Sequence, residues 1–256
     1  MDGDGKEIVI RLRGVVTRIG DRLIHDHLDL DVHRGEIMAV VGGSGSGKSV
    51  LLRSIVGLMR PNGGSIEVLG RDVLGLDEES MRALQMRWGV LFQDGALFSS
   101  QSVAENVQVP LREYTSMSQE LMNEIAAMKL SMVGLGEDAA TKHPSELSGG
   151  MRKRASLARA LVLDPEIVFL DEPTSGLDPI GAANFDQLVR DLQKSLNLTV
   201  FMVTHDLDTL RATADRIAVL VDGRLKVGTI ESLRNDRDPW IQEYFSGPRG
   251  RAALAS

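Results

Sequence analysis

The sequence predicts an α/β fold built around a mainly parallel β-sheet, and three observations support this. Apolar runs of strand length alternate with amphipathic helical segments over most of the chain. A glycine-rich loop, residues 42–49, lies between an apolar run and an amphipathic segment. Asp171 and Glu172 directly follow another apolar run, as expected at the carboxyl edge of a parallel sheet. Strands joined by helices favour parallel pairing in a three-layered arrangement.

Length and composition fit one globular core with a small inserted subdomain. The chain has 256 residues, 43% of them hydrophobic, a formal net charge of -7 and no cysteine. The absence of cysteine excludes disulfides and thiolate metal or redox sites. The acidic balance argues against nucleic-acid binding by the whole surface, although a local basic patch is compatible with it. The polar residues 1–7, and the lack of an apolar run of about 18 residues, predict neither a signal peptide nor a membrane span.

Hydrophobic spacing places the individual elements along the chain. Strands are marked either by alternation of apolar and polar residues or by uninterrupted apolar runs. The predicted strands are Ile8 to Leu12, Leu28 to Val32, Ile37 to Val41, Ser65 to Leu69, Trp88 to Phe92, Ile167 to Leu170, Thr199 to Val203, Arg216 to Val221 and Arg224 to Val227. The last two flank Asp222-Gly223, which is typical of a two-residue hairpin turn. The predicted helices are Val50 to Leu58, Arg152 to Leu163, Phe185 to Leu196 and Leu207 to Ala214.

Between Gly95 and Glu146 the β-branched runs fade and helical spacing takes over, which predicts an inserted helical subdomain. One apolar helix face is expected to comprise Leu121, Ile125, Met128 and Leu130. Three methionines crowd the same region, namely Met117, Met122 and Met132. Core filling is their favoured role, and a partner-facing surface is the alternative.

The loop Gly42-Gly43-Ser44-Gly45-Ser46-Gly47-Lys48-Ser49 fits the pattern G-x-x-x-x-G-K-[ST] of a phosphate-binding loop. Its glycines let the backbone curl so that successive N–H groups point at phosphate oxygens. Lys48 is expected to reach the β- and γ-phosphates, and Ser49 to offer its hydroxyl to Mg²⁺. The helix that follows directs its partially positive end at the same anion. A flexible Gly/Ser loop is the alternative, but the preceding strand and following helix supply the context that the motif requires.

Polar residues at the ends of other apolar runs complete the predicted site. Asp171 is expected to hold Mg²⁺, and Glu172 to polarise the water that attacks the γ-phosphate. His205, two residues beyond Val203, is expected to hydrogen-bond the γ-phosphate and to keep the water and Glu172 in register. Gln93 is expected to meet both Mg²⁺ and water, and its loop leads into the helical insertion. A surface acidic pair and a structural histidine are the alternatives for these positions.

A second anion-binding element precedes the helix predicted at Arg152 to Leu163. It consists of the Ser148 hydroxyl and the bare amides of Gly149 and Gly150 at a helix N-terminus. A simple turn is the alternative reading of such a short motif. One chain cannot easily bring two such elements to one phosphate from opposite sides, whereas two chains packed head to tail can. Two copies packed in this way would form a homodimer with composite sites.

Over about residues 8–228 these motifs resemble, in the family's order, those of the nucleotide-binding subunits of ABC transporters. The resemblance identifies the Walker A loop at 42–49, the Q-loop at Gln93, the signature at Leu147 to Met151, the Walker B strand at Ile167 to Glu172, the D-loop at Ser175 to Asp178 and the switch histidine at His205. It implies ATP and Mg²⁺ as ligands and ATPase activity. It also implies a P-loop NTPase core of the RecA-like type, with an N-terminal antiparallel β subdomain and an inserted helical subdomain.

The resemblance suggests a division of the chain and shows two departures from the family. The ATP-binding core is expected at residues 1–95 and 152–228, the helical subdomain with the signature at 96–151, and a C-terminal extension at 229–256 with ten mobile terminal residues. In that extension Trp240, Tyr244 and Phe245 favour packing on the chain's own surface over contact with another subunit. Ile19 stands where an aromatic residue usually stacks on adenine, and Met151 stands where glutamine is commoner.

A narrower resemblance, to Mla-type ATPases of bacterial phospholipid traffic, rests on three stretches: Leu91 to Phe98, Asn106 to Glu113 and Pro144 to Met151. It implies a MlaE-like membrane permease, an MCE-domain protein of the MlaD-like type, a small MlaB-like STAS-type protein, no nucleic acid, and a peripheral position on the cytoplasmic side of the inner membrane. An ABC importer or exporter ATPase for another substrate, a soluble ABC ATPase acting on DNA or ribosomes, and a module that binds ATP without hydrolysing it are the alternatives. The single acidic cassette argues against the DNA or ribosome ATPase, and the intact Glu172 and His205 against the binding module.

Overall fold

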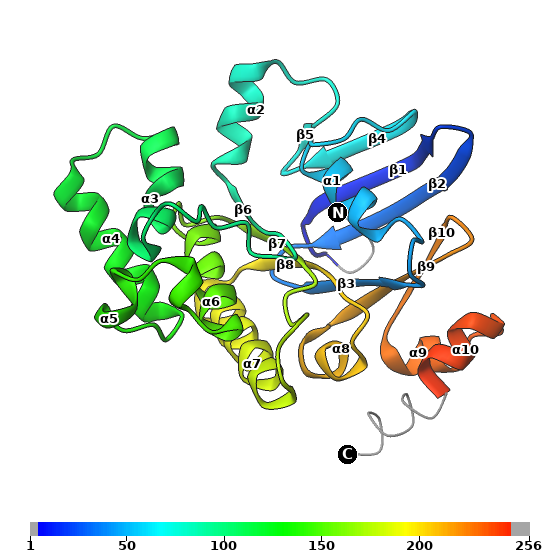
Figure 1. Ribbon diagram of the computed structural model, residues 1–256. Coiled ribbons are helices and arrows are strands. Elements are labelled where there is room, and N and C mark those ends of the chain that lie inside the picture. The colour runs from blue at the N-terminus through cyan, green and yellow to red at the C-terminus, as the bar shows by residue number, and fades with distance from the viewer. Residues whose placement is uncertain (1–4, 247–256) are drawn as a thin grey trace. The chain divides into compact units, whose positions relative to one another are not determined.

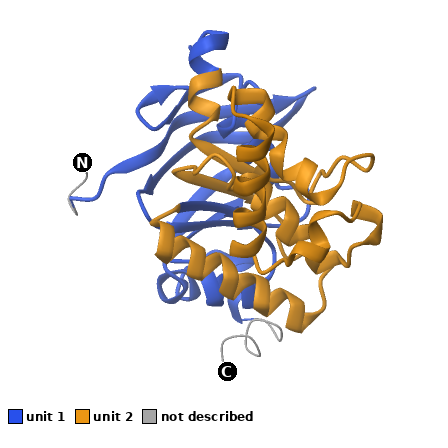
Figure 2. Cartoon of the chain, turned by 90° about the vertical axis from the view of Figure 1, so that its left-hand side faces the viewer, with its two compact units in different colours: residues 1–81, 199–256 blue, residues 82–198 orange. Residues whose placement is uncertain are grey.

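The computed structural model describes residues 5–246. Two compact units are present: unit 1 combines the chain up to Met81 with the part from Thr199, and unit 2 comprises residues 82–198 (Figure 2). The two units divide the chain at positions other than 95, 151 and 228, so the predicted domain division stays a prediction. The predicted mobility of the last ten residues, 247–256, concerns a segment outside the described range.

Unit 1 contains a four-stranded antiparallel sheet in the order β2-β1-β4-β5 (Figure 1). Its strands are β1 (Ile8–Ile19), β2 (Arg22–His33), β4 (Gly63–Val68) and β5 (Arg71–Asp72). The first two are much longer than predicted. A bulge interrupts their pairing between Leu12 and Val15, where Gly14 adopts φ +57, so the period-two pattern shifts and hides the rest of the strand.

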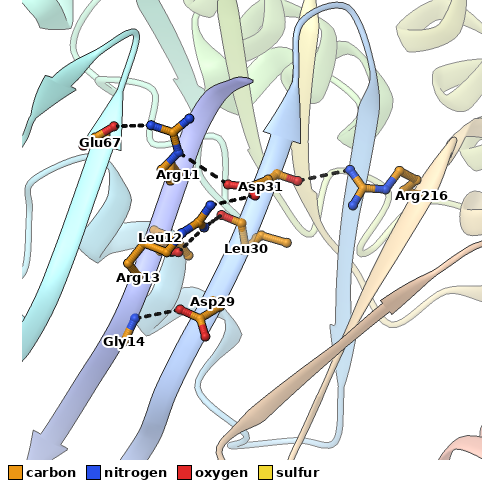
Figure 3. A network of polar contacts seen from close by, with 9 residues as sticks. All are labelled: Arg11, Leu12, Arg13, Gly14, Asp29, Leu30, Asp31, Glu67 and Arg216. Atoms are coloured by element: carbon orange, nitrogen blue, oxygen red, sulfur yellow. Dashed lines mark hydrogen bonds and ion pairs between the residues drawn. The ribbon is translucent and has the colours of Figure 1, made fainter. Parts of the chain in front are cut away.

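Charged side chains form a network over this sheet and tie it to the next one (Figure 3). Arg11 Nη1 donates to Glu67 Oε2 at 2.9 Å, and Arg11 Nε lies 3.8 Å from Asp31 Oδ1. Arg13 Nη2 donates to Asp31 Oδ2 at 2.8 Å. From strand β9, Arg216 Nη1 donates to the Asp31 carbonyl at 3.1 Å. Arg216 therefore links the antiparallel sheet to the larger sheet of unit 1.

The larger sheet of unit 1 presents strands in the order β10-β9-β3-β8. They are β3 (Ile37–Gly42), β8 (Thr199–Val203), β9 (Arg216–Val221) and β10 (Arg224–Gly228). Strand β3 pairs in parallel with both β8 and β9, and β9 pairs antiparallel with β10. Asp222 and Gly223 connect the last pair with φ of 48 and 75, which confirms the predicted hairpin.

Helices cover both faces of β3 and β9 (Figure 1). Helix α1 (Lys48–Ile55) lies on one face, and α8 (Leu207–Thr213), α9 (Ile230–Arg234) and α10 (Pro239–Ser246) lie on the other. Ile241 and Phe245 are buried in the core beside Ala39 and Val41. Packing of the aromatic segment on the chain's own surface is thereby confirmed for the described residues.

Unit 2 pairs β6 (Trp88–Leu91) with β7 (Ile167–Asp171) in parallel. Its helical elements are α3 (Val103–Tyr114), α4 (Gln119–Met132), α5 (Glu137–Ala140), the 3₁₀ helix η1 (Pro144–Glu146), α6 (Gly149–Ala160) and α7 (Pro179–Leu196). Helix α2 (Glu78–Gln85), which was not predicted, contains the boundary between the units. Among residues 5–246, each helix is too short or too polar to span a lipid bilayer.

The predicted apolar face of α4 is wrong at Leu121 and Met128 and is confirmed at Leu130. Leu121 and Met128 are 43% and 50% exposed, and the buried residues are Met122, Ala126, Lys129 and Leu130. Lys129 occupies the inner stripe because its ammonium pairs with Asp164 at 2.5 Å. A lysine stem can fill an inner position of a helix when its ammonium finds a partner, so apolar spacing alone does not identify the buried face of α4.

Candidate functional site

The predicted phosphate-binding loop joins β3 to α1 in a tight curl. Gly45 and Gly47 have φ of +71 and +106, a region that L residues rarely adopt. A Cβ at Gly47 would lie 2.5 Å from Ile24 Cγ2, and one at Gly42 would lie 2.5 Å from the Leu220 carbonyl oxygen. Gly42 and Gly47 are therefore required by packing, as the sequence predicts.

The loop is rich in groups that can donate hydrogen bonds to an anion. Lys48 Nζ donates to the carbonyls of Gly42 and Gly43 at 2.9 and 3.0 Å, which holds the ammonium over the loop. Ser46 Oγ is buried and has no hydrogen-bond partner among the described residues. A buried hydroxyl of this kind needs a partner, and a phosphate oxygen supplies one. The loop, with the α1 N-terminus behind it, fits a phosphate group.

A cavity of about 270 Å³ lies beside this loop in unit 1. It is lined by Gly43 to Ser46, Arg22 to Ile24, Leu220 to Gly223 and Trp240. Trp240 stacks on Tyr244 with ring centroids 5.0 Å apart, and the Tyr244 hydroxyl donates to the His205 carbonyl at 3.1 Å. Helix α10 thus reaches both the loop and the backbone of the predicted switch histidine.

His205 and the loop lie at the same sheet edge, as predicted. Strands β3 and β8 run parallel with Val40 opposite Val203, and the Thr204 amide donates to the Val40 carbonyl at 3.1 Å. His205 is exposed just beyond β8, before α8. The predicted role of its imidazole toward a phosphate stays a prediction.

Sequence reasoning missed His25, which supports the loop from β2. The imidazole is fully buried, with Nε2 3.1 Å from the Gly47 carbonyl and Nδ1 3.0 Å from Thr17 Oγ1. Because a carbonyl only accepts, we assign the proton to Nε2, and Nδ1 accepts from the Thr17 hydroxyl. Burial lowers the pKa of His25, although the Gly47 hydrogen bond opposes the shift. A neutral imidazole therefore holds the loop at Gly47.

In unit 2 the structure brings Gln93, Asp171 and Glu172 to one sheet edge. Strands β6 and β7 run parallel with Leu91 opposite Leu170, so the residues just beyond them are neighbours. Asp171 is buried at 4% exposure. Within unit 2 the Asp171 carboxylate and the Gln93 amide oxygen are hard donors of the kind that Mg²⁺ prefers. The predicted role of the Ser49 hydroxyl, which belongs to unit 1, stays a prediction.

Ser148 and Asp178 both act as helix N-caps in the described chain. Ser148 Oγ accepts from the Met151 amide at 3.2 Å, and Asp178 Oδ1 accepts from the Ile180 and Gly181 amides at 3.1 and 2.9 Å. These caps start α6 and α7 earlier than predicted, and the Asp-Pro sequence at 178–179 was the missed signal for α7. The predicted roles of Ser148, Gly149, Gly150 and Asp178 toward a nucleotide stay predictions.

Comparison with known proteins gives consistent similarities. A family model described as ABC transporter matches residues 25–175. The chain is 40% identical over 251 residues to the probable ribonucleotide transport ATP-binding protein mkl of Mycobacterium leprae, covering 96% of this chain and 72% of the relative. It is 40% identical over 240 residues to the intermembrane phospholipid transport system ATP-binding protein MlaF of Haemophilus influenzae, covering 93% and 90%.

Solved structures give the same similarity at the level of the fold. The dimeric post-hydrolysis state of the ATP-binding cassette MJ0796, bound to ADP and Pi, matches with a TM-score of 0.79 and 31% identity, covering 86% of this chain and 98% of that chain. The ABC transporter component cbiO1 of Clostridium perfringens matches with a TM-score of 0.79 and 27% identity, covering 95% and 93%.

Proposed function

The chain belongs to the ABC transporter ATP-binding family, and we propose that within this family it powers phospholipid transport across a bacterial cell envelope. It is an ATPase with a P-loop NTPase fold. The observation that carries the proposed substrate is the match to a phospholipid transport ATPase over 93% of this chain and 90% of the relative. The equally identical relative named for ribonucleotide transport is matched over 72% of its length, and it supplies the second candidate substrate.

In the proposed mechanism the loop binds the triphosphate of ATP. The amides of residues 43–47, the Lys48 ammonium and the Ser46 hydroxyl surround its oxygens. Ser49, Gln93 and Asp171 would hold Mg²⁺, which would supply positive charge against the β- and γ-phosphates. Glu172 accepts the proton of the attacking water, and His205 donates a hydrogen bond to the γ-phosphate.

The proposed working form is a homodimer that closes over two ATP molecules. Ser148, Gly149, Gly150 and Asp178 of one copy complete the site that begins at Lys48 in the other. Loss of the γ-phosphate removes contacts between the copies, so the dimer opens. Opening moves the helical subdomain at 96–151, which acts on a MlaE-like permease from a peripheral position at the inner membrane. MlaD-like and MlaB-like proteins are the further proposed subunits.

ATP turnover by wild type and Glu172→Gln tests the mechanism. The general base supplies about 100-fold or more of the rate, so the variant should lose at least that much turnover and retain ATP binding. Glu124→Gln, at an exposed position of α4, is the matched control and should keep the wild-type rate. Comparable rates for wild type and Glu172→Gln would refute the assignment of the base.

The composite site and the substrate need separate measurements. With Mg²⁺ and ATP, Glu172→Gln should elute from size exclusion as a dimer, and a variant that stays monomeric alone and with its permease contradicts the dimer. For the substrate, the complex is purified from membranes, its bound small molecules are identified, and its ATPase is measured with phospholipid vesicles or with ribonucleotides. Stimulation by ribonucleotides without bound phospholipid would overturn the phospholipid proposal.

A further inference from the structure

Lys153 is a buried cation that the proposed mechanism does not use. It lies in α6, and only 6% of its surface is exposed. Its ammonium donates to two main-chain carbonyls, those of Gln93 and Glu172, the latter at 3.0 Å. All three residues belong to unit 2. A single side chain thus joins the backbone of the Q-loop to that of the proposed general base.

The carbonyl that Lys153 binds belongs to a residue in an unusual conformation. Glu172 has φ 49, in the left-handed region that residues with a Cβ rarely occupy. Such a conformation persists when surrounding groups hold it. Because the backbone conformation sets the direction of the Cα–Cβ bond, a bond that holds the Glu172 carbonyl also limits where its carboxylate can lie.

Another side chain of the same helix binds main-chain carbonyls in the rest of the Q-loop. Arg159 donates to the carbonyls of Gly95 and Ala96, each at 2.7 Å. A Cβ at Gly95 would lie 2.5 Å from Ser156 Oγ. Lys153, Ser156 and Arg159 recur at intervals of three, which places them on one side of α6. Segment 93–96 and α6 therefore form one contiguous assembly.

Charge around the ammonium explains why a lysine can occupy this position. Burial lowers the pKa of Lys153, and the carboxylates of Asp94, Glu172 and Asp171 oppose that shift. A buried cation is tolerated when it is hydrogen-bonded and lies near opposite charge. Both conditions hold here.

We propose that Lys153 is a positioning residue for the ATPase reaction, which holds the Gln93 and Glu172 backbones in one arrangement and connects them to the helix that Ser148 begins. The proposal rests on the proposed function, since it requires Glu172 to act on the attacking water. Displacement of α6 would then be transmitted directly to the base. Lys153 itself touches no reacting atom in this scheme.

Steady-state ATPase kinetics on the purified full chain test the proposal. Lys153→Met keeps the aliphatic stem and removes the donors, and misplacing a catalytic group by about 1 Å costs on the order of 100-fold. We expect kcat to fall by about that factor while KM for Mg·ATP changes less than about two-fold. Lys153→Arg, which keeps donors, should recover most of kcat. Lys129→Met is the matched control, because Lys129 is equally buried but bonds Asp164, and its kcat should stay near wild type.

A double-mutant comparison separates a positioning role from a structural one. In the Glu172→Gln background, Lys153→Met should cause no further loss of single-turnover hydrolysis, because both changes disable the same base. An independent, multiplicative loss would overturn the proposal, as would a wild-type kcat in Lys153→Met. If Lys153→Met does not fold, Lys153→Gln, whose amide nitrogen lies one bond nearer the backbone than Nζ, takes its place in the same comparison. Equal turnover of Glu172→Gln and wild type would instead mark failure of the proposed mechanism, and the role of Lys153 would fall with it.

Discussion

Replacement of His25 should loosen the phosphate-binding loop without removing any proposed catalytic group. The histidine is fully buried and bonds the Gly47 carbonyl through Nε2 and Thr17 through Nδ1. An asparagine amide can occupy the place of Nδ1, but it does not reach the Gly47 carbonyl. A glutamine amide can occupy the place of Nε2. The pair His25→Asn and His25→Gln therefore separates the two contacts.

The size of the effect follows from the contact that is lost. The Gly47 carbonyl also accepts from the Leu51 amide at 2.8 Å, so the imidazole is one of its two donors and its loss costs about 0.5–1.5 kcal/mol. A chain of this size loses about 2–4 °C in melting temperature per kcal/mol. His25→Asn should therefore melt roughly 1–6 °C below wild type. Because Gly47 is held at φ +106, loss of the imidazole bond should also weaken ATP binding by up to about ten-fold, the equivalent of about 1.4 kcal/mol. His25→Gln should retain most of both properties.

Thermal melting and titration with a fluorescent ATP analogue measure the two effects. His27→Asn is the matched control, because this side chain lies two residues along β2 and is 76% exposed. A surface change of this kind should stay within about 0.5 kcal/mol of wild type. Wild-type melting and ATP affinity in His25→Asn would refute the reasoning, and so would equal losses in the Asn and Gln variants.

Three further predictions concern pH, close packing and the C-terminal helix. Because burial lowers the pKa of His25 from 6.5, its contribution to the free energy of unfolding should be complete above about pH 6.5 and should be lost as pH falls through the lowered pKa. Urea unfolding at several pH values should show a smaller acid loss in His25→Gln, and equal losses contradict this. Gly89→Ala places a Cβ 1.9 Å from the Ala160 carbonyl oxygen, so it should lower the free energy of unfolding by about 3 kcal/mol or more, as measured by thermal melting. In the control Gly63→Ala the nearest atom to the new Cβ is Val16 Cβ at 3.9 Å, and no such loss is expected. Tyr244→Phe removes the hydrogen bond to the His205 carbonyl but keeps the ring on Trp240, so it should lower the free energy of unfolding by about 1 kcal/mol. Tyr244→Ala should lower it further, and equal stability of wild type and both variants would argue against the contact.

Features that depend on local periodicity or on backbone geometry could be predicted from the sequence. The apolar runs at β3 and β8 are buried strands, and Asp222-Gly223 forms the expected hairpin. Gly42 and Gly47 are required by packing at the loop. In each case the residue type itself carries the signal. Aspartate and glycine tolerate the left-handed turn at 222–223, only glycine fits the crowded backbone at 42 and 47, and apolar side chains fill the interior.

Predictions failed where a long-range contact reversed a local expectation. A lysine in an amphipathic helix is expected to face solvent, yet Lys129 is 2% exposed because Asp164 neutralises it. Gly14 shifts the period-two pattern of β1, so the strand continues to Ile19 although the predicted strand ends at Leu12. Both the Asp164 partner of Lys129 and the bulge between Leu12 and Val15 can be seen only in the folded chain.

The supporting residues His25 and Lys153 escaped prediction for a deeper physical reason. Motif residues such as Lys48 and Glu172 act through their own side chains, so their chemistry can be read from residue type and spacing. His25 and Lys153 instead act on carbonyl groups 22, 60 and 19 residues away in the sequence, and the main-chain carbonyl is the same at every residue. A sequence pattern can therefore show which side chain performs the chemistry, but the group that holds its backbone in place is visible only once the strands and helices are assembled.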